Sequence, residues 1–230
     1  MSLSQVFRSA AISAVLAGTA VTASAGGIAI PVNAFVANSV QDFSIEANQN
    51  FRQVGIKVSA KGTAFANADK VNSFTLPVTS ITISPLLKIL SGTAQGSALQ
   101  FDRIGEDEET GEEVATRLTL ANFTINYTTK QVLADATAYG VTKKQLPIFN
   151  FQTLTPLGLK YKFPLTITGH EVLGDLALTP EARELYRVNL KLPDFVVPLL
   201  TTLRFGTLTQ DISTKLRSTP VSTKPYVPAN

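Results

Sequence analysis

The chain has 230 residues, of which 44% are hydrophobic and 16% are charged, and its formal net charge is only +3. This composition excludes a chain that is disordered throughout and favours one medium-sized domain, since a chain of this length buries roughly 70% of its unfolded surface. The small net charge argues against the dense basic surface that holds a phosphate backbone, so we expect no nucleic-acid partner. Cysteine is absent, which excludes disulfides, thiol nucleophiles and thiolate metal sites.

The first 25 residues have the features of an export signal. Arg8 lies in a short polar region, residues 10–21 are apolar, and residues 23–25 read ASA. This pattern predicts a signal peptide that is cleaved after Ala25; the alternative is a buried N-terminal helix. We therefore expect a bacterial protein that is exported to the periplasm, the cell surface or the medium, with no transmembrane segment in the mature chain.

Segments that alternate with period two follow the leader, as expected for strands with one buried face. Candidate strands cover residues 53–60, 62–67, 72–83 and 97–104. Residues 84–90 (SPLLKIL) begin with a Ser-Pro pair that is typical of a helix start, but the segment is equally compatible with a strand.

Six carboxylates lie within residues 106–113, which read EDEETGEE. The D-x-D-x-D-G spacing of a calcium loop is missing, and Thr110 and Gly111 stand where a hairpin would turn. We interpret the run as a solvated acidic loop; the alternative is contact with a cation or a basic partner.

Residues 117–141 predict a β-hairpin with a bulge. The alternation changes phase at Ala121 and Asn122, then resumes after residues 128–130. Asn122 and Asn126 each match the glycosylation motif N-x-T. In an exported bacterial protein we interpret both asparagines as ordinary polar strand surface.

The only histidine, His170, follows a predicted strand at 159–168, with Glu171 beside it and Asp175 five residues on. A serine hydrolase would need a nucleophile on a motif such as G-x-S-x-G, which the chain lacks. A zinc site would need three oxygen ligands beside the one histidine. His170, Glu171 and Asp175 are thus the only candidate site residues, and we favour a loop histidine with local hydrogen bonds.

The best helix signal covers residues 178–189, where Thr179 suits the N-cap, Pro180 the first turn and Glu181 the N-terminal dipole. Residues 193–203 are apolar and hold Pro198, so any helix there is short.

The clearest strand covers residues 207–217, and residues 218–230 follow it with three prolines. The tail predicts an extended segment that drapes over the sheet or hangs free. The alternation predicts that five residues of this strand share its core face: Leu208, Gln210, Ile212, Thr214 and Leu216.

The chain has thirteen Phe, five Tyr and no Trp. The absence of Trp argues against a sugar-binding surface, because such surfaces use exposed Trp and Tyr rings to contact the sugar. Several phenylalanines are predicted to pack the core, with the alternative that some line an apolar ligand cavity; they are Phe149, Phe151, Phe163, Phe195 and Phe205.

Together these patterns predict an all-β protein, an antiparallel β-sandwich or flattened barrel with one short α-helix at about 180–188, in one β-rich domain over residues 26–217. No motif for a nucleotide, haem, flavin or metal is present, so we expect no cofactor.

The function that these patterns favour is a non-enzymatic exported β-domain with a binding or structural role, whose partner is a protein or an apolar small molecule. One alternative is a carrier of an apolar ligand such as a lipid in a β-lined pocket, and another is a hydrolase using His170. An apolar pocket of several hundred Å³ would favour the carrier.

Overall fold

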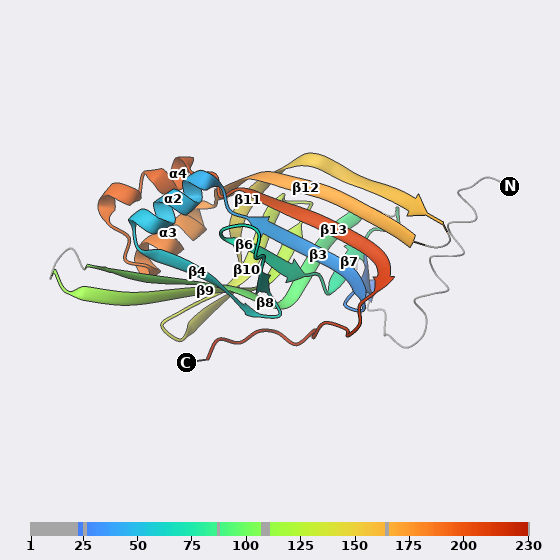
Figure 1. Cartoon of the computed structure of the whole chain (residues 1–230), viewed down its shortest axis with the longest axis horizontal. Coiled ribbons are helices and arrows are strands. Elements are labelled where there is room, and N and C mark those ends of the chain that lie inside the picture. The colour runs from blue at the N-terminus through green and yellow to red at the C-terminus, as the bar shows by residue number, and fades with distance from the viewer. Residues whose placement is uncertain (1–22, 25–26, 87, 107–110, 164–165, 230) are drawn as a thin grey trace.

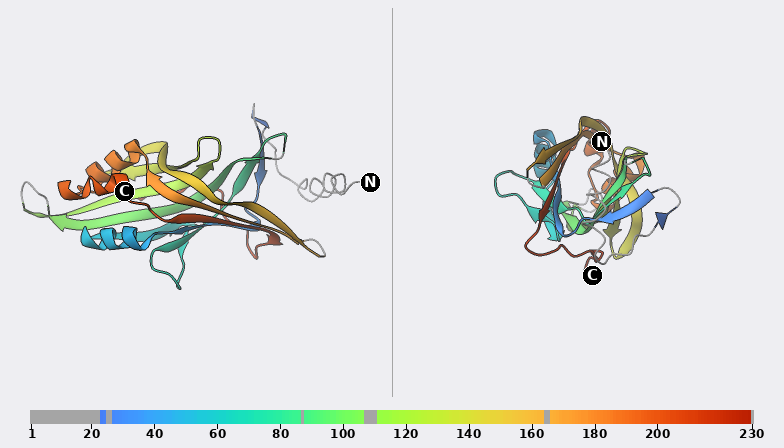
Figure 2. Two further views of the ribbon diagram at one scale, coloured as in Figure 1. Left: turned by 90° about the horizontal axis from the view of Figure 1, so that it is seen from above. Right: turned by 90° about the vertical axis from the view of Figure 1, so that its right-hand side faces the viewer.

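The computed structural model describes residues 23–24, 27–86, 88–106, 111–163 and 166–229. One antiparallel sheet of 13 strands curls along the long axis of the molecule, and short helices cover one end of it (Figures 1 and 2). The predicted all-β antiparallel fold is therefore confirmed, in a form closer to a flattened, incompletely closed barrel than to a sandwich. Within these ranges, no helix has both the length and the apolar character needed to span a bilayer.

The strands differ widely in length, and the four longest form two hairpins, β8–β9 and β11–β12, with β10 between them. In chain order they are β1 (Ala23–Ser24), β2 (Gly27–Pro31), β3 (Phe35–Asp42), β4 (Ile56–Gly62), β5 (Phe65–Ala66), β6 (Ser73–Pro77), β7 (Ser80–Ile83), β8 (Ile89–Glu106), β9 (Glu113–Asn126), β10 (Gln131–Ala138), β11 (Val141–Lys162), β12 (Thr166–Leu178) and β13 (Thr207–Leu216).

The sheet follows the order β1-β2-β7-β8-β9-β10-β11-β12-β13-β3-β6-β5, and β4 pairs with the second half of β8. Neighbours along the chain from β7 to β13 thus pair with one another, and β13 turns back onto β3. Because β6 leads directly into β7, the two sides of the curled sheet approach each other and enclose an apolar interior.

The predicted bulge at Asn122 is confirmed, but its side chain is buried rather than on the surface. Asn122 has a φ of 53°, and the pairing of β9 with β10 shifts register there. Its amide nitrogen donates to Asp135 Oδ2 (2.9 Å) and to the carbonyl of Tyr226 (3.0 Å), and its Oδ1 accepts from the amide of Tyr226 (2.8 Å). The bulge therefore fastens the extended C-terminal tail to the sheet.

Three helices and one 3-10 turn cover one end of the sheet: α2 (Ile45–Gln53), α3 (Pro180–Asn189), η1 (Asp194–Val196) and α4 (Leu199–Thr202) (Figure 1). The predicted helix appears as α3, whose N-cap Thr179 accepts from the amide of Ala182. The prediction of a single helix is wrong, because α2 also forms, with Ser44 as its N-cap.

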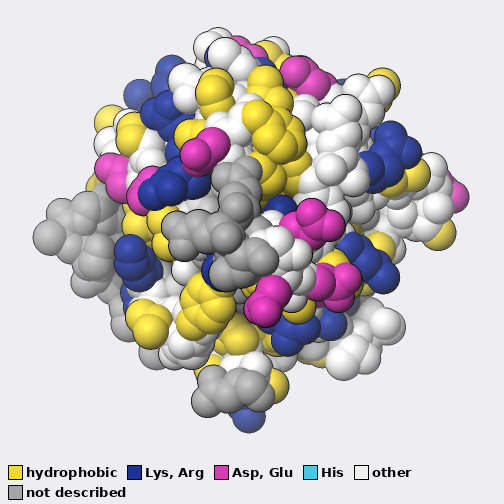
Figure 3. All heavy atoms as spheres, turned by 90° about the vertical axis from the view of Figure 1, so that its left-hand side faces the viewer, with side chains coloured by type: hydrophobic (Ala, Val, Ile, Leu, Met, Phe, Trp, Pro, Cys, Tyr) yellow, Lys and Arg dark blue, Asp and Glu magenta, His cyan; other side chains and the backbone are white. Residues whose placement is uncertain are grey.

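Aromatic rings fill the space between these helices and the sheet. Phe51 of α2 lies 5.3 Å from Phe43, and Tyr186 of α3 lies 5.4 Å from Phe101, measured between ring centroids. Phe205 lies 5.4 Å from Phe149. These edge-on and tilted contacts close the helix end of the molecule. Figure 3 faces this end and shows acidic and basic side chains interspersed over it.

Of the phenylalanines predicted to pack the core, Phe149, Phe151 and Phe205 are buried, but two are not. Phe163 is 85% exposed and Phe195 is 70% exposed, so those predictions are wrong. The same holds for Leu216, which is 72% exposed because β13 runs beyond the covered part of the sheet.

Two predicted segments fall largely outside the described residues. The leader is one of them, apart from Ala23 and Ser24, which pair with β2. The other is the acidic run, of which Glu106 and Glu113 pair at the ends of β8 and β9. Of the ambiguous segment 84–90, residues 85–86 form a turn and residues 89–90 begin β8; Ser84 Oγ accepts from the amide of Lys88.

Candidate functional site

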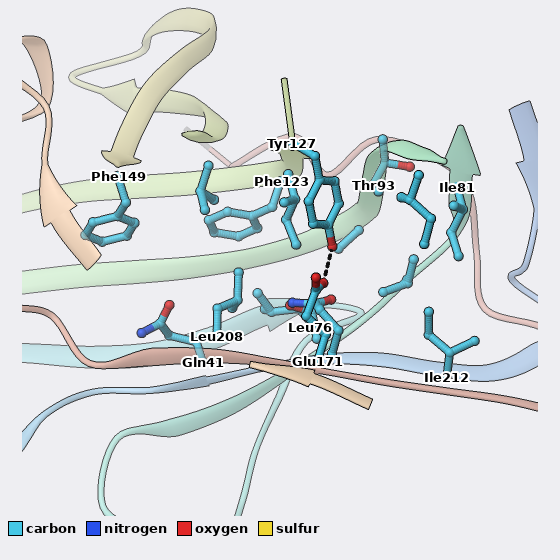
Figure 4. Close-up of a pocket in the computed structure, with 18 of the residues that line it drawn as sticks. Gln41, Leu76, Ile81, Thr93, Phe123, Tyr127, Phe149, Glu171, Leu208 and Ile212 are labelled. Carbon is cyan, nitrogen blue, oxygen red and sulfur yellow. Dashed lines mark hydrogen bonds between the residues drawn. The ribbon is translucent and has the colours of Figure 1, made fainter. Parts of the chain in front are cut away.

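A narrow apolar cleft lies inside the curled sheet, and we call it the central cleft. It begins under the helix end, at Phe43, Phe101 and Phe149, and extends toward the opposite end, at Ile81 and Ile212 (Figure 4). Its remaining walls come from eight strands, the link between β6 and β7, and the turn after β9: Ser39, Gln41, Leu76, Val78, Ile89, Gly92, Thr93, Ala94, Leu99, Leu120, Phe123, Ile125, Tyr127, Val132, Leu157, Glu171, Leu208 and Gln210.

The central cleft is long but slender. Its atom-free space, with the opening to solvent included, is about 790 Å³, yet the part wide enough for the centre of a water-sized sphere is only about 40 Å³. A ligand must therefore be slender or must widen the cleft as it enters. The curled sheet is not closed along its whole length, so its walls have room to separate.

Alternation along the strands explains why these side chains meet. On β13, Leu208, Gln210 and Ile212 face the cleft, as the period-two pattern of residues 207–217 predicts. On β12 the same rule turns Glu171 inward, and its neighbour His170 outward. Because most inward positions hold apolar residues, the interior of the cleft favours an apolar ligand over water.

One carboxylate interrupts the apolar lining. Glu171 is 6% exposed, and its Oε2 accepts a hydrogen bond of 2.6 Å from the hydroxyl of Tyr127 (Figure 4). Burial raises the pKa of the Glu171 carboxyl above its usual value, although the hydrogen bond from Tyr127 opposes the shift. Burial, and then the contact with Glu171, raise the pKa of the Tyr127 hydroxyl well above its usual value.

The other polar residues of the cleft are bonded to the protein. Gln210 Nε2 donates to Ser39 Oγ (2.8 Å), and Gln41 Nε2 donates to the carbonyl of Phe205 (3.3 Å). Thr93 Oγ1 lies 2.7 Å from Ser80 Oγ. None of these side chains carries a charge, in contrast to Glu171.

The three candidate residues of the histidine segment do not converge. His170 lies on the outer surface of β12, where its Nδ1 is 2.8 Å from Asp211 Oδ1. Glu171 points into the cleft, and Asp175 lies further along β12, 3.6 Å from Arg204. Within the described part of the chain, no group of three or more His, Cys, Asp or Glu side chains is placed to hold a metal.

Sequence reasoning named Glu171 but missed its partner Tyr127 and the surrounding cleft. A usable signal exists for Glu171: it shares the inward parity of Ile167 and Leu173 on β12, so the alternation alone places a carboxylate on an apolar face. Nothing local marks Tyr127, which lies 44 residues away.

Comparison of the chain with protein-family models, with curated proteins and with solved structures gave no match.

Proposed function

We propose that this protein is an exported, non-enzymatic carrier that binds an apolar ligand, such as a lipid, in the central cleft. The observation that carries the proposal is the cleft itself, a mostly apolar hollow within an incompletely closed β-sheet. Burial of a methylene group contributes about 0.8 kcal/mol, so a chain-like ligand gains affinity with each carbon that it places between these walls.

The geometry favours a carrier over a hydrolase. His170, the only histidine, lies outside the cleft and contacts Asp211, so a histidine base and the apolar cleft are on opposite faces of β12.

The proposal is tested by titrating the purified protein with the neutral apolar dye N-phenyl-1-naphthylamine and following its fluorescence. We expect a saturable rise with about one dye per chain, which long-chain alcohols or amines reverse. A linear, unsaturable signal from folded protein would refute the carrier and leave a structural or protein-binding role.

A further inference from the structure

The central cleft has one place where a ligand can make a strong polar contact. Tyr127 donates to Oε2 of Glu171, whereas Oε1 of Glu171 has no hydrogen-bond partner among the described residues. The carboxylate is nine-tenths buried, and the side chains around it are mainly aliphatic or aromatic. Oε1 is not one of the described side-chain atoms that are both fully buried and unpartnered, so it keeps some accessible surface, which the donor of a ligand can reach.

The charge of the lining decides which head group can take that place. No Lys, Arg or His is among the residues that line the cleft. A carboxylate or phosphate head group would therefore enter a dry site beside Glu171 without a cation to compensate it. An amine or a hydroxyl can donate to Oε1, and an ammonium group also gains an ion pair.

From this arrangement we infer that the ligand of the central cleft is an apolar chain or ring with a hydrogen-bond-donating head group, an amine or an alcohol, seated on Glu171. The inference rests on the proposed carrier function and adds the chemical class of its ligand. Glu171 acts as the selective contact, and Tyr127 holds its carboxylate in place from the facing side of the cleft (Figure 4).

The test compares three competitors of equal chain length, dodecylamine, dodecanol and dodecanoate, for displacement of N-phenyl-1-naphthylamine below their micelle concentrations at pH 7.5. We expect the amine and the alcohol to displace the dye at concentrations at least tenfold lower than dodecanoate. Glu171→Gln keeps an acceptor for Tyr127 but removes the charge, so the gap should shrink to less than threefold. The matched control is Glu184→Gln, which removes an exposed carboxylate of α3 and should keep the parent order.

The outcomes separate this inference from the carrier proposal. If the dye binds but dodecanoate competes as well as the amine and the alcohol, the head-group inference is wrong and the carrier stands. An unchanged order in Glu171→Gln would also overturn it. If the dye does not bind at all, the carrier proposal itself fails.

A second, independent observation concerns the end of the molecule opposite the helices. Beyond Leu157, which lines the cleft, the apolar residues continue with Leu159 and Tyr161 of β11 and with Phe163 directly after it, all more than half exposed. A Cβ placed on Gly169 of β12 would contact both Leu157 and Leu159, which confirms that these two leucines share a face. The apolar wall of the cleft thus continues, uncovered, as far as Phe163, and Figures 1 and 2 show the ends of β11 and β12 projecting beyond the neighbouring strands.

The charges at this end are of one sign. Lys160 and Lys162 alternate with the exposed apolar residues of β11, Lys88 precedes β8, and Lys215 lies at the end of β13. Among the described residues of segments 77–101, 142–170 and 212–229, none is Asp or Glu. The helix end differs, because both signs of charge mix there (Figure 3).

Exposed apolar residues with interspersed lysines fit the surface of a bilayer that contains anionic lipids. We propose that the tip formed by Leu159, Tyr161 and Phe163 docks on such a membrane, with Lys160 and Lys162 at the head groups. This contact would place the open wall of the cleft against the lipid phase, where an apolar ligand enters or leaves.

Flotation with vesicles tests the docking proposal, using phosphatidylcholine alone and a 7:3 mixture with phosphatidylglycerol at low salt. We expect the parent protein to bind the mixed vesicles and added salt to weaken this binding. Phe163→Asp should bind the same vesicles at least tenfold more weakly. The control is Phe195→Asp, which changes an equally apolar, 70% exposed residue at the helix end and should bind like the parent.

Three results would overturn docking: no binding to the mixed vesicles, equal loss in both variants, or a dimer in solution that Phe163→Asp dissociates. The last would assign the tip to a second copy of the chain instead of a membrane.

Discussion

Filling the central cleft from within its wall should weaken ligand binding by about two orders of magnitude without unfolding the protein. Gly92 lines the cleft, and a Cβ placed on it meets no atom within 4 Å. Its backbone φ lies outside the left-handed region, so Gly92→Leu adds a side chain to open space without strain.

The expected loss of affinity follows from the number of ligand carbons that the new side chain displaces. A leucine side chain has four carbons and displaces about four methylene groups of a ligand, a loss of about 3 kcal/mol at ~0.8 kcal/mol per methylene. At 1.4 kcal/mol for each factor of ten, the dissociation constant should rise about 200-fold. The variant should be at least as stable as the parent, because burial of a leucine side chain contributes about 1.5–3 kcal/mol.

The assay is dye titration together with thermal melts of the parent, Gly92→Leu and Gly158→Leu. Gly158 is the matched control: it lies on β11 beside the shallow outer hollow near His170, and the nearest atom to its added Cβ is 4.0 Å away. Folded Gly92→Leu that binds dye as tightly as the parent would refute the placement of the ligand, as would an equal loss in Gly158→Leu.

Three further predictions concern residues around the cleft. His170→Ala should leave dye binding unchanged and lower the free energy of unfolding by no more than about 1 kcal/mol, since the exposed hydrogen bond to Asp211 contributes little; a large loss of binding would return His170 to the site. Ile212→Asp, which puts a charge in the cleft wall, should destabilise the protein by about 1–3 kcal/mol and weaken dye binding, while Ser213→Asp should do neither; equal melting temperatures would mean that the facing of β13 is misassigned. The pKa of Glu171 is raised in the folded state, so the stability that this carboxyl contributes is fully present below its unfolded pKa and is lost as pH rises through its folded pKa. Glu171→Gln should therefore have the same melting temperature as the parent near pH 4 and a higher one near pH 8.

Period-two alternation was a sound guide wherever a strand has one face in the interior. It predicted the inward positions of Leu208, Gln210 and Ile212, and the phase change at Asn122 predicted the bulge. It failed where a strand leaves the covered region: Phe163 and Leu216 keep the inward parity but have no opposite wall to pack against. Local pattern reports which face a residue occupies, whereas burial depends on distant segments.

The missed features depend on contacts between segments that are far apart in the sequence. The α2 segment IEANQNFRQ has few apolar residues, and its helix is stabilised by Phe51 packing beneath it and by Ser44, which accepts from Ala47 and donates to the carbonyl of Arg204. The cleft likewise joins side chains of strands from β3 to β13, and the Tyr127–Glu171 pair joins two of its walls. No short stretch of sequence contains these arrangements.

Native mass spectrometry of the protein purified from its own host tests the carrier proposal most directly. We expect a species heavier than the chain by one small molecule, which organic extraction removes and which is identified as an apolar amine or alcohol. We also expect that Gly92→Leu, purified in the same way, shows only the mass of the chain. A parent protein that is folded and carries no small molecule, and that binds none when exposed to lipid extract of the host, would contradict the account.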